Sequence, residues 1–170
     1  MHGAKEKSDS KIIKLSIAAI LTFALSSCSK QHDTSMVSTY KFVTEQSSVT
    51  QTGGLAGVHE TYPIEGSFQL SVNYDANTAS FERVDANMTE STGFLPTQNL
   101  NELFNMTKLK GVINNNTAIV FTGKTSEPES TVSITVVLAD DTVTMKGGTT
   151  PPQGSADFFI FNLDAFAKKE

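Results

Sequence analysis

Apolar and polar residues alternate along most of the chain after residue 38. This two-residue period predicts β-strands with one buried and one exposed face. We expect strands over 39–50, 62–74, 79–89, 108–113, 117–124, 131–138, 142–147 and 157–166. The last of these has apolar residues at both parities, which predicts a strand that is central in the sheet or covered by a helix.

Three local features qualify the strand pattern. Pro63 cannot donate a ladder hydrogen bond, so its strand begins after it or bends there. Phe81 has the opposite parity to Val84, and a bulge near Glu82–Arg83 would direct both side chains inward. Turns are expected at 75–78, 114–116 and 140–141, and the Gly-rich and Pro-rich segments 51–57 and 147–154 are expected to lie outside strands.

The segment 95–106 is the one predicted helical region, with a short helix near 97–106. Leu100, Leu103 and Phe104 share one face of such a helix. Asn99 is a suitable N-cap, and Glu102 three residues later completes a pair like a capping box. A helix this short is not stable alone, so it should pack on the sheet.

About eight strands with mostly short connections and one short helix predict an all-β domain. An antiparallel meander of this size forms a small barrel or a rolled sandwich. We favour the barrel because most connections look local, and a Greek-key sandwich is the alternative.

The first 27 residues have a different pattern. Four lysines at positions 5, 7, 11 and 14 precede an apolar run from Leu15 to Leu25. Eleven helical residues span roughly 16 Å, about half of a ~30 Å hydrocarbon core, so the run is too short to cross a membrane. The order of basic, apolar and small residues predicts a cleaved secretory signal peptide over 1–27.

The signal ends in Leu25-Ser26-Ser27-Cys28. This sequence resembles the lipobox of bacterial lipoproteins, and the resemblance covers residues 1–28. In that class a diacylglycerol is attached to the cysteine thiol, the signal is cut before the cysteine, and the new amine often receives a further acyl chain such as palmitate. The resemblance implies a lipid anchor on Cys28. The alternatives are an ordinary secreted protein and a cytoplasmic protein with a buried N-terminal helix.

A lipid anchor on Cys28 implies a location in the bacterial cell envelope. Ser29 follows the cysteine, and the absence of aspartate there implies transfer to the outer membrane in proteobacteria-like sorting, whereas a Gram-positive host has no outer membrane. We expect residues 28–38 to form a flexible tether and residues 39–170 to form a single β domain. Periplasmic and surface orientations both remain open.

Removal of the signal changes the charge of the protein. The whole chain has 13 basic and 18 acidic residues, and loss of residues 1–27 leaves 9 and 16, a net charge of −7 over 143 residues. This is the opposite of the balance on nucleic-acid-binding surfaces, and it predicts repulsion from anionic headgroups. Lipid should therefore hold the protein at the membrane. The single cysteine excludes an internal disulfide.

Few residues suit catalysis or metal binding. The mature chain contains only His32, in the predicted tether, and His59, near a strand start, and it has no Gly-x-Ser-x-Gly motif. A zinc site needs three or four ligands, which a cysteine-free domain cannot readily supply. We therefore predict no catalytic residue, no metal and no cofactor. The alternative is a hydrolase in which His59 meets a serine and an aspartate in a cleft.

The triplet Asp-Ala-Asn occurs twice, beginning at Asp75 and at Asp85. Such triplets form part of some calcium loops, but calcium takes six to eight oxygen ligands. Asx turns are the simpler interpretation of both triplets.

Residues 66–81, GSFQLSVNYDANTASF, resemble hairpins in the barrel domains of outer-membrane surface lipoproteins of the transferrin-binding type, although the Gly-flanked aromatic signature of those barrels is missing. We predict a lipoprotein whose non-catalytic β domain binds an unidentified protein or small ligand at the envelope and no nucleic acid. A structural or adhesive surface module is the third hypothesis. An apolar cavity would favour a small lipophilic ligand, and an exposed apolar patch without a cavity would favour the structural role.

Overall fold

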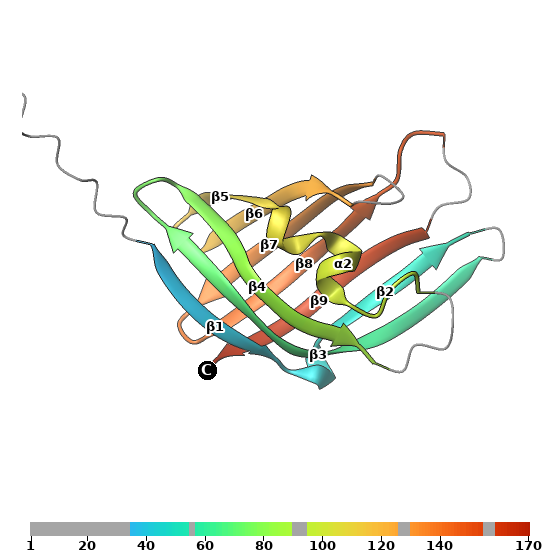
Figure 1. Cartoon of the computed structure of the whole chain (residues 1–170), viewed down its shortest axis with the longest axis horizontal. Helices are drawn as coiled ribbons and strands as arrows, with labels where there is room; N and C mark the ends of the chain where they lie inside the picture. The colour runs from blue at the N-terminus through green and yellow to red at the C-terminus, as the bar shows by residue number, and fades with distance from the viewer. Residues whose placement is uncertain (1–34, 55–56, 90–94, 126–129, 155–158) are drawn as a thin grey trace, which may run out of the picture. The chain divides into compact units, whose positions relative to one another are not determined.

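The strands pair as an antiparallel meander that closes on itself (Figure 1). The computed structural model describes residues 35–54, 57–89, 95–125, 130–154 and 159–170, and residues 34–170 belong to one unit. The predicted signal peptide, Cys28 and His32 lie outside the described residues. The strands are β1 (Met36–Phe42), β2 (Ser48–Gly53), β3 (Val58–Asn73), β4 (Thr78–Met88), β5 (Lys110–Asn115), β6 (Ala118–Lys124), β7 (Thr131–Ala139), β8 (Thr142–Thr150) and β9 (Phe159–Lys169).

The sheet order is β1-β3-β2-β9-β8-β7-β6-β5-β4, and pairing between β3 and β4 closes the barrel. Each strand from β2 to β8 pairs with its successor in the chain, and β9 pairs with β2. The prediction of an all-β barrel is therefore confirmed, and the Greek-key alternative is excluded. Strands that are consecutive in the chain are therefore neighbours in the sheet, as expected for short connections.

β1 and β2 together fill one position in the barrel. Both lie between β3 and β9: β1 faces Ser67–Val72 of β3, whereas β2 faces Val58–Pro63 of the same strand. A 3-10 helix, η1 (Thr44–Gln46), separates them, so the strand predicted over 39–50 is broken. β1 begins at Met36, which places three residues of the predicted tether in the barrel wall.

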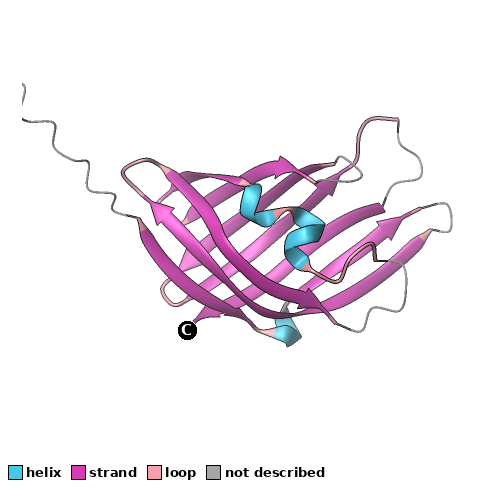
Figure 2. Ribbon diagram, viewed as in Figure 1, coloured by secondary structure: helices cyan, strands magenta, loops and turns pink. Residues whose placement is uncertain are grey.

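The two ends of the barrel differ in their connections. At one end, the tight end, residues 74–77, 116–117 and 140–141 connect the strands. At the other end, the loop end, the connections span 54–57, 89–109, 125–130 and 151–158, and the last three are longer than any at the tight end. Figure 2 shows the short turns and the start of β1 at the left and the longer connections at the right.

A short helical segment completes the wall between β4 and β5. These strands pair only through Thr78–Val112 and Ala79–Gly111, so they diverge toward the loop end. The connection between them contains α2 (Leu100–Phe104) and η2 (Met106–Lys108), and both contact β4. The side chains that this segment buries are Leu100, Leu103, Phe104, Met106 and Leu109. The predicted helix and its buried face are confirmed.

Of the two capping bonds predicted for α2, the structure has one. Asn99 Oδ1 accepts a hydrogen bond from the Glu102 backbone N–H at 3.0 Å, as the N-cap prediction requires. The Glu102 carboxylate does not complete a capping box, because it accepts a 2.7 Å bond from the Thr97 hydroxyl. Asn105 ends the helix in the left-handed region at φ 54°.

Glycine lets strands continue where the sequence predicted interruption. β8 runs through Gly147 and Gly148 to Thr150, so the prediction that residues 147–154 lie outside strands is wrong for 147–150. A Cβ on Gly148 would lie 2.2 Å from the Phe161 carbonyl oxygen, and one on Gly66 would lie 2.1 Å from that of Asp85. These positions exclude other residues because neighbouring backbone approaches too closely.

Two other interruptions in the strand pattern have different outcomes. The predicted bulge is confirmed: Gln69 is opposite Arg83 and Leu70 is opposite Phe81, so Glu82 is the extra residue. β3 does not begin after Pro63 but continues through it. Pro63 is opposite the first residue of β2, beside the break at η1, where a missing N–H is tolerated.

The barrel interior is filled with side chains. Tyr40, Phe68, Phe81 and Phe121 form a row of rings, with successive centroids 5.4, 5.8 and 4.4 Å apart. Phe68, Phe81 and Phe121 are at most 2% exposed, so no water-sized space adjoins them. The large apolar cavity that would favour a lipophilic ligand is therefore missing from this part of the interior.

Some apolar residues of the predicted strands are exposed. β9 lies between β8 and the β1–β2 position, so the prediction of a central strand is confirmed, although Ile160 on its outer face is exposed. Tyr74, at the end of the strand predicted over 62–74, is exposed because it lies in the turn after β3. Tyr62, at the start of the same predicted strand, is buried.

Candidate functional site

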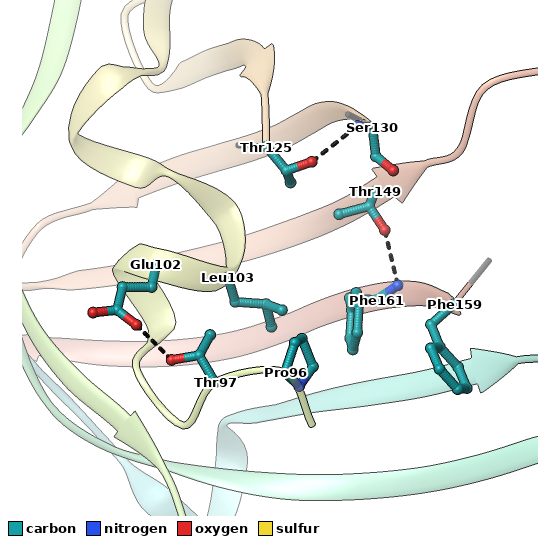
Figure 3. Close-up of a pocket in the computed structure, with 9 residues that line it drawn as sticks. All are labelled: Pro96, Thr97, Glu102, Leu103, Thr125, Ser130, Thr149, Phe159 and Phe161. Carbon is teal, nitrogen blue, oxygen red and sulfur yellow. Dashed lines mark hydrogen bonds between the residues drawn. The ribbon is translucent and has the colours of Figure 1, made fainter. Parts of the chain in front are cut away.

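A pocket of about 170 Å³ lies at the loop end, between the helical segment and strands β6 to β9 (Figure 3). We call it the loop-end pocket. Its apolar lining consists of Pro96, Leu103, Phe159 and Phe161. Its polar lining consists of Thr97, Glu102, Thr125, Ser130 and Thr149.

Hydroxyl groups follow one side of the pocket, across the ends of β6, β7 and β8. Thr149 Oγ1 accepts a 2.9 Å bond from the Phe161 N–H, just beyond the last β8–β9 register pair, Gly148–Asn162. Thr125 Oγ1 accepts a 2.9 Å bond from the Ser130 N–H, and the Thr125 N–H donates to the Ser130 carbonyl oxygen at 3.0 Å. Backbone bonds therefore fix both hydroxyl oxygens in place. The Thr149 hydroxyl accepts in its bond to Phe161, so its own proton can be donated to a ligand.

The opposite side is formed by the segment that carries α2. Leu103 is buried and points toward Phe161 and Pro96 in Figure 3. The Glu102 carboxylate is exposed and directed toward Thr97, away from the rings. The centre of the pocket is thus apolar, and its charge lies at the rim.

Beside the pocket floor is a buried polar residue, Gln51. The register places Gln51 on β2 opposite Phe161 on β9, and Thr149 is hydrogen-bonded to Phe161 from β8. Gln51 is 0% exposed, and its Nε2 has no hydrogen-bond partner among the described residues. A buried donor without a partner costs about 1–3 kcal/mol. A hydrogen-bond acceptor placed beside Gln51 Nε2 would therefore be stabilised by this amide.

Gln51 is part of a polar group with Tyr62 and Glu60 on β3. The Tyr62 hydroxyl lies 3.2 Å from Gln51 Oε1 and closer still to the Glu60 carboxylate. A phenol has one proton, so it donates to one acceptor at a time. Burial raises the pKa of Tyr62 to about 12, and the hydrogen bond and negative charge of Glu60 add to the increase.

The size and lining of the loop-end pocket limit what it can bind. Pockets for drug-sized ligands span about 300–1,000 Å³, whereas an engineered apolar cavity of about 150 Å³ in another protein holds benzene. A volume of about 170 Å³ therefore suits one ring or one side chain. Hydroxyls along one wall suit a ring or chain that carries a hydrogen-bonding group.

The structure separates His59 from this site. His59 is exposed on β3 opposite Thr52, and it has the opposite parity to the inward-facing Glu60 and Tyr62. The hydrolase hypothesis required His59 in a cleft with a serine and an aspartate. His59 instead lies exposed on the outer face of the barrel, which is not a cleft.

The two Asp-Ala-Asn triplets also differ from each other. Asp75 lies in the turn between β3 and β4, where Asn77 has φ 56°, so a turn is confirmed there. The side-chain bond in this turn comes from Asn73, whose Oδ1 accepts from the Ala76 N–H at 2.8 Å. Asp85 lies within β4 and pairs with Arg83, so the prediction of a turn at Asp85 is wrong. No group of three His, Cys, Asp or Glu side chains in the described part of the chain could hold a metal ion.

Sequence reasoning did not identify Gln51, Thr149, Phe159 or Phe161 as site residues. Gln51 was assigned to a loop, and Thr149 to an interruption of β8. Extension of the inward parity from Val49 would have flagged Gln51 as a buried polar residue. The pocket itself depends on where the α2 segment packs, which periodicity alone does not specify.

The chain matches no protein-family model, no curated protein and no solved structure in comparisons with each. Within the described ranges, no helix is both long and apolar enough to cross a bilayer.

Proposed function

We propose that the chain is a lipid-anchored protein of the bacterial envelope whose barrel is a non-catalytic binding module. The lipobox-like sequence ending at Cys28 supports the anchor, with the outer membrane as the expected location because Ser29 follows it. The loop-end pocket supports the binding role, and it is the observation that carries the proposal.

The ligand that fits best is a ring-sized, mainly apolar group with one hydrogen-bonding substituent. Phe161 and Leu103 provide contact area, while Ser130 and Thr149 provide hydroxyls within the same pocket. Such a group belongs either to a small molecule or to an aromatic side chain of a partner protein. Because the interior around Phe68, Phe81 and Phe121 is packed, a long acyl chain has no space to enter that part of the barrel core.

The binding proposal is tested with p-cresol as the probe, with benzene and glycerol for comparison. We expect p-cresol to shift the amide NMR signals of Phe161 and Ser130 more strongly than glycerol does, and to bind more tightly than benzene. Pro96→Phe, at the pocket rim, should weaken the response. Pro152→Phe is the matched control because Pro152 is exposed and does not line the pocket. Equal responses to all probes, or no effect of Pro96→Phe, would argue against a binding site here.

The anchor is tested separately. Cys28→Ala should abolish incorporation of labelled fatty acid and release the protein from the membrane fraction. Retention of the variant in membranes would overturn the lipid-anchor proposal and leave the pocket experiment unaffected.

A further inference from the structure

The exposed apolar side chains of the barrel gather toward the tight end. The large hydrophobic residues exposed among those described are Met36, Val37, Tyr74, Val112, Val137 and Ile160, with exposed fractions of 58, 58, 41, 50, 39 and 36%. All but Ile160 lie at or near the tight end, in β1, the β3–β4 turn, β5 and β7. We call these five the tight-end patch.

Hydrogen bonds and strand register connect the members of this patch. Asn73 Nδ2 donates to Ser35 Oγ at 3.3 Å, which links the start of β1 to the end of β3. The Tyr74 hydroxyl donates to the Asn116 carbonyl oxygen at 3.4 Å, which links the β3–β4 turn to the β5–β6 turn. On the outer face, Val112 is opposite Val120, and Val137 is opposite Ala118. The apolar side chains therefore lie along one continuous part of the rim.

The chain enters the barrel beside this patch. Ser35 is the first described residue, and only seven residue steps separate it from Cys28. A chain extends at most about 3.6 Å per residue, so an anchor on Cys28 keeps the start of β1 within about 25 Å of the lipid. The loop end is at the opposite end of the barrel, as the strand directions require (Figure 1).

Charge is distributed unevenly around the same rim. The β7–β8 turn carries Asp140 and Asp141, and the end of β9 carries Lys168 and Lys169. Both acidic turns border the patch: Asp140 follows Val137 by three residues, and Asp75 follows Tyr74 in the β3–β4 turn. Tyrosine is favoured at the level of lipid headgroups, and an adjacent carboxylate can stay in water there. This arrangement suits shallow contact with a zwitterionic surface rather than deep insertion.

We infer that the tight-end patch rests on the lipid surface to which Cys28 is anchored, so that the loop-end pocket faces away from the membrane. The inference rests on the proposed lipid anchor. It adds an orientation to that anchor, because a tether alone would allow either end of the barrel to approach the lipid.

The experiment exploits the absence of tryptophan from the chain. Single tryptophans are introduced by Tyr74→Trp and Val37→Trp in the patch, and by Ile160→Trp as the loop-end control. Each lipid-modified protein is placed in phosphatidylcholine vesicles with or without brominated acyl chains, which quench tryptophan fluorescence on contact. We expect several-fold stronger quenching of the two patch variants than of Ile160→Trp.

The possible outcomes distinguish a wrong orientation of the barrel from a wrong assignment of the lipid anchor. Vesicle retention with equal quenching at all three positions, or with stronger quenching at Ile160→Trp, overturns the orientation. A blue-shifted Tyr74→Trp emission without quenching also overturns it, because the patch then contacts protein. Failure of the unaltered protein to stay on vesicles overturns the anchor instead. Circular dichroism of each variant identifies any that does not fold, and the second patch variant then provides the comparison.

Discussion

The Ser47 hydroxyl makes two hydrogen bonds with the backbone of Phe166: it donates to the carbonyl oxygen at 2.8 Å and accepts from the N–H at 3.0 Å. A strand would normally exchange these bonds with β9 through its own backbone. At the break between β1 and β2 a side chain takes this role, and Ser47 is buried as a result. The Ser47 hydroxyl, together with the Val43 N–H, thus keeps the chain bonded to β9 beside the break at η1.

Ser47→Ala should lower the free energy of unfolding by about 1–3 kcal/mol, because the Phe166 N–H is left buried without this acceptor. The Phe166 carbonyl oxygen keeps a bond from the Val43 N–H at 2.9 Å, which limits the loss. Urea denaturation measures the change, and hydrogen exchange should show faster exchange at the Phe166 amide. Ser48→Ala, one residue later and half-buried, is the control. Equal losses in the two variants would contradict the assigned role of Ser47.

Gly66→Ala should destabilise the barrel by more than about 4 kcal/mol or prevent folding. Gly66 has φ 121°, and a Cβ there would lie 2.1 Å from the Asp85 carbonyl oxygen and 2.7 Å from the Ala86 Cα. Backbone strain and a clash with rigid neighbouring backbone act together. Gly154→Ala separates the two effects, because Gly154 has φ 91° with nothing within 4 Å of the added Cβ.

The Gly154→Ala loss should be only about 1 kcal/mol, the size of the backbone strain alone. Thermal or urea unfolding compares the two variants. A Gly66→Ala loss as small as that of Gly154→Ala would show that β3 and β4 can separate at this point without cost.

The raised pKa of Tyr62 predicts that the free energy of unfolding decreases at alkaline pH. An unfolded tyrosine has a pKa near 10, whereas the pKa in the folded protein is raised to about 12. Between these values the unfolded state has lost the proton that the folded state keeps, so this contribution is fully present below pH 10 and falls as pH rises toward 12. The slope is at most about 1.4 kcal/mol per pH unit.

Comparison with Tyr62→Phe isolates this contribution from the other groups that titrate at alkaline pH. The variant should have lower stability at neutral pH, because Gln51 and Glu60 lose a partner, and it should show a shallower decline from pH 9 to pH 11. Urea unfolding at several pH values gives the two slopes. Parallel slopes for the two proteins would be inconsistent with the raised pKa.

Asn99→Ala should reduce the free energy of unfolding by about 1 kcal/mol, through loss of the N-cap bond to Glu102. It should also weaken p-cresol binding, because the same segment places Pro96 and Leu103 against the pocket. Gln98→Ala is the control, since Gln98 contacts Met88 through its backbone carbonyl oxygen. An affinity unchanged by Asn99→Ala would mean that the cap does not position the pocket wall.

The sequence predicted those elements whose side chains repeat with a clear period. Val132, Ile134 and Val136 alternate with hydroxyl residues, and β7 follows that pattern. A turn was also predicted at 114–116, and it lies at 116–117, directly after Asn115 at the end of β5. The Asn115 side-chain oxygen accepts bonds from the Thr117 and Ala118 N–H groups at 3.0 and 2.8 Å, and no residue of 114–116 has positive φ.

Features set by tertiary contact could not be predicted. Gly147 and Gly148 signal a break locally, but in the barrel they permit close approach of β7 and β9 to β8. The break at η1 is marked only by a change of inward parity, from Tyr40 and Phe42 in β1 to Val49 in β2, and parity alone does not place the break. Both errors arise where the curvature of the closed barrel, rather than local preference, determines the backbone.

The placement of β1 determines how the domain would respond to mechanical force. β1 starts at the tight end and runs into the barrel, where it is held by six register pairs with β3 and three with β9. Ladder hydrogen bonds are perpendicular to the strands. A pull from a lipid anchor along β1 would therefore load these bonds together in shear, instead of opening them one at a time. The first strand of the barrel is built to carry tension from its own N-terminus.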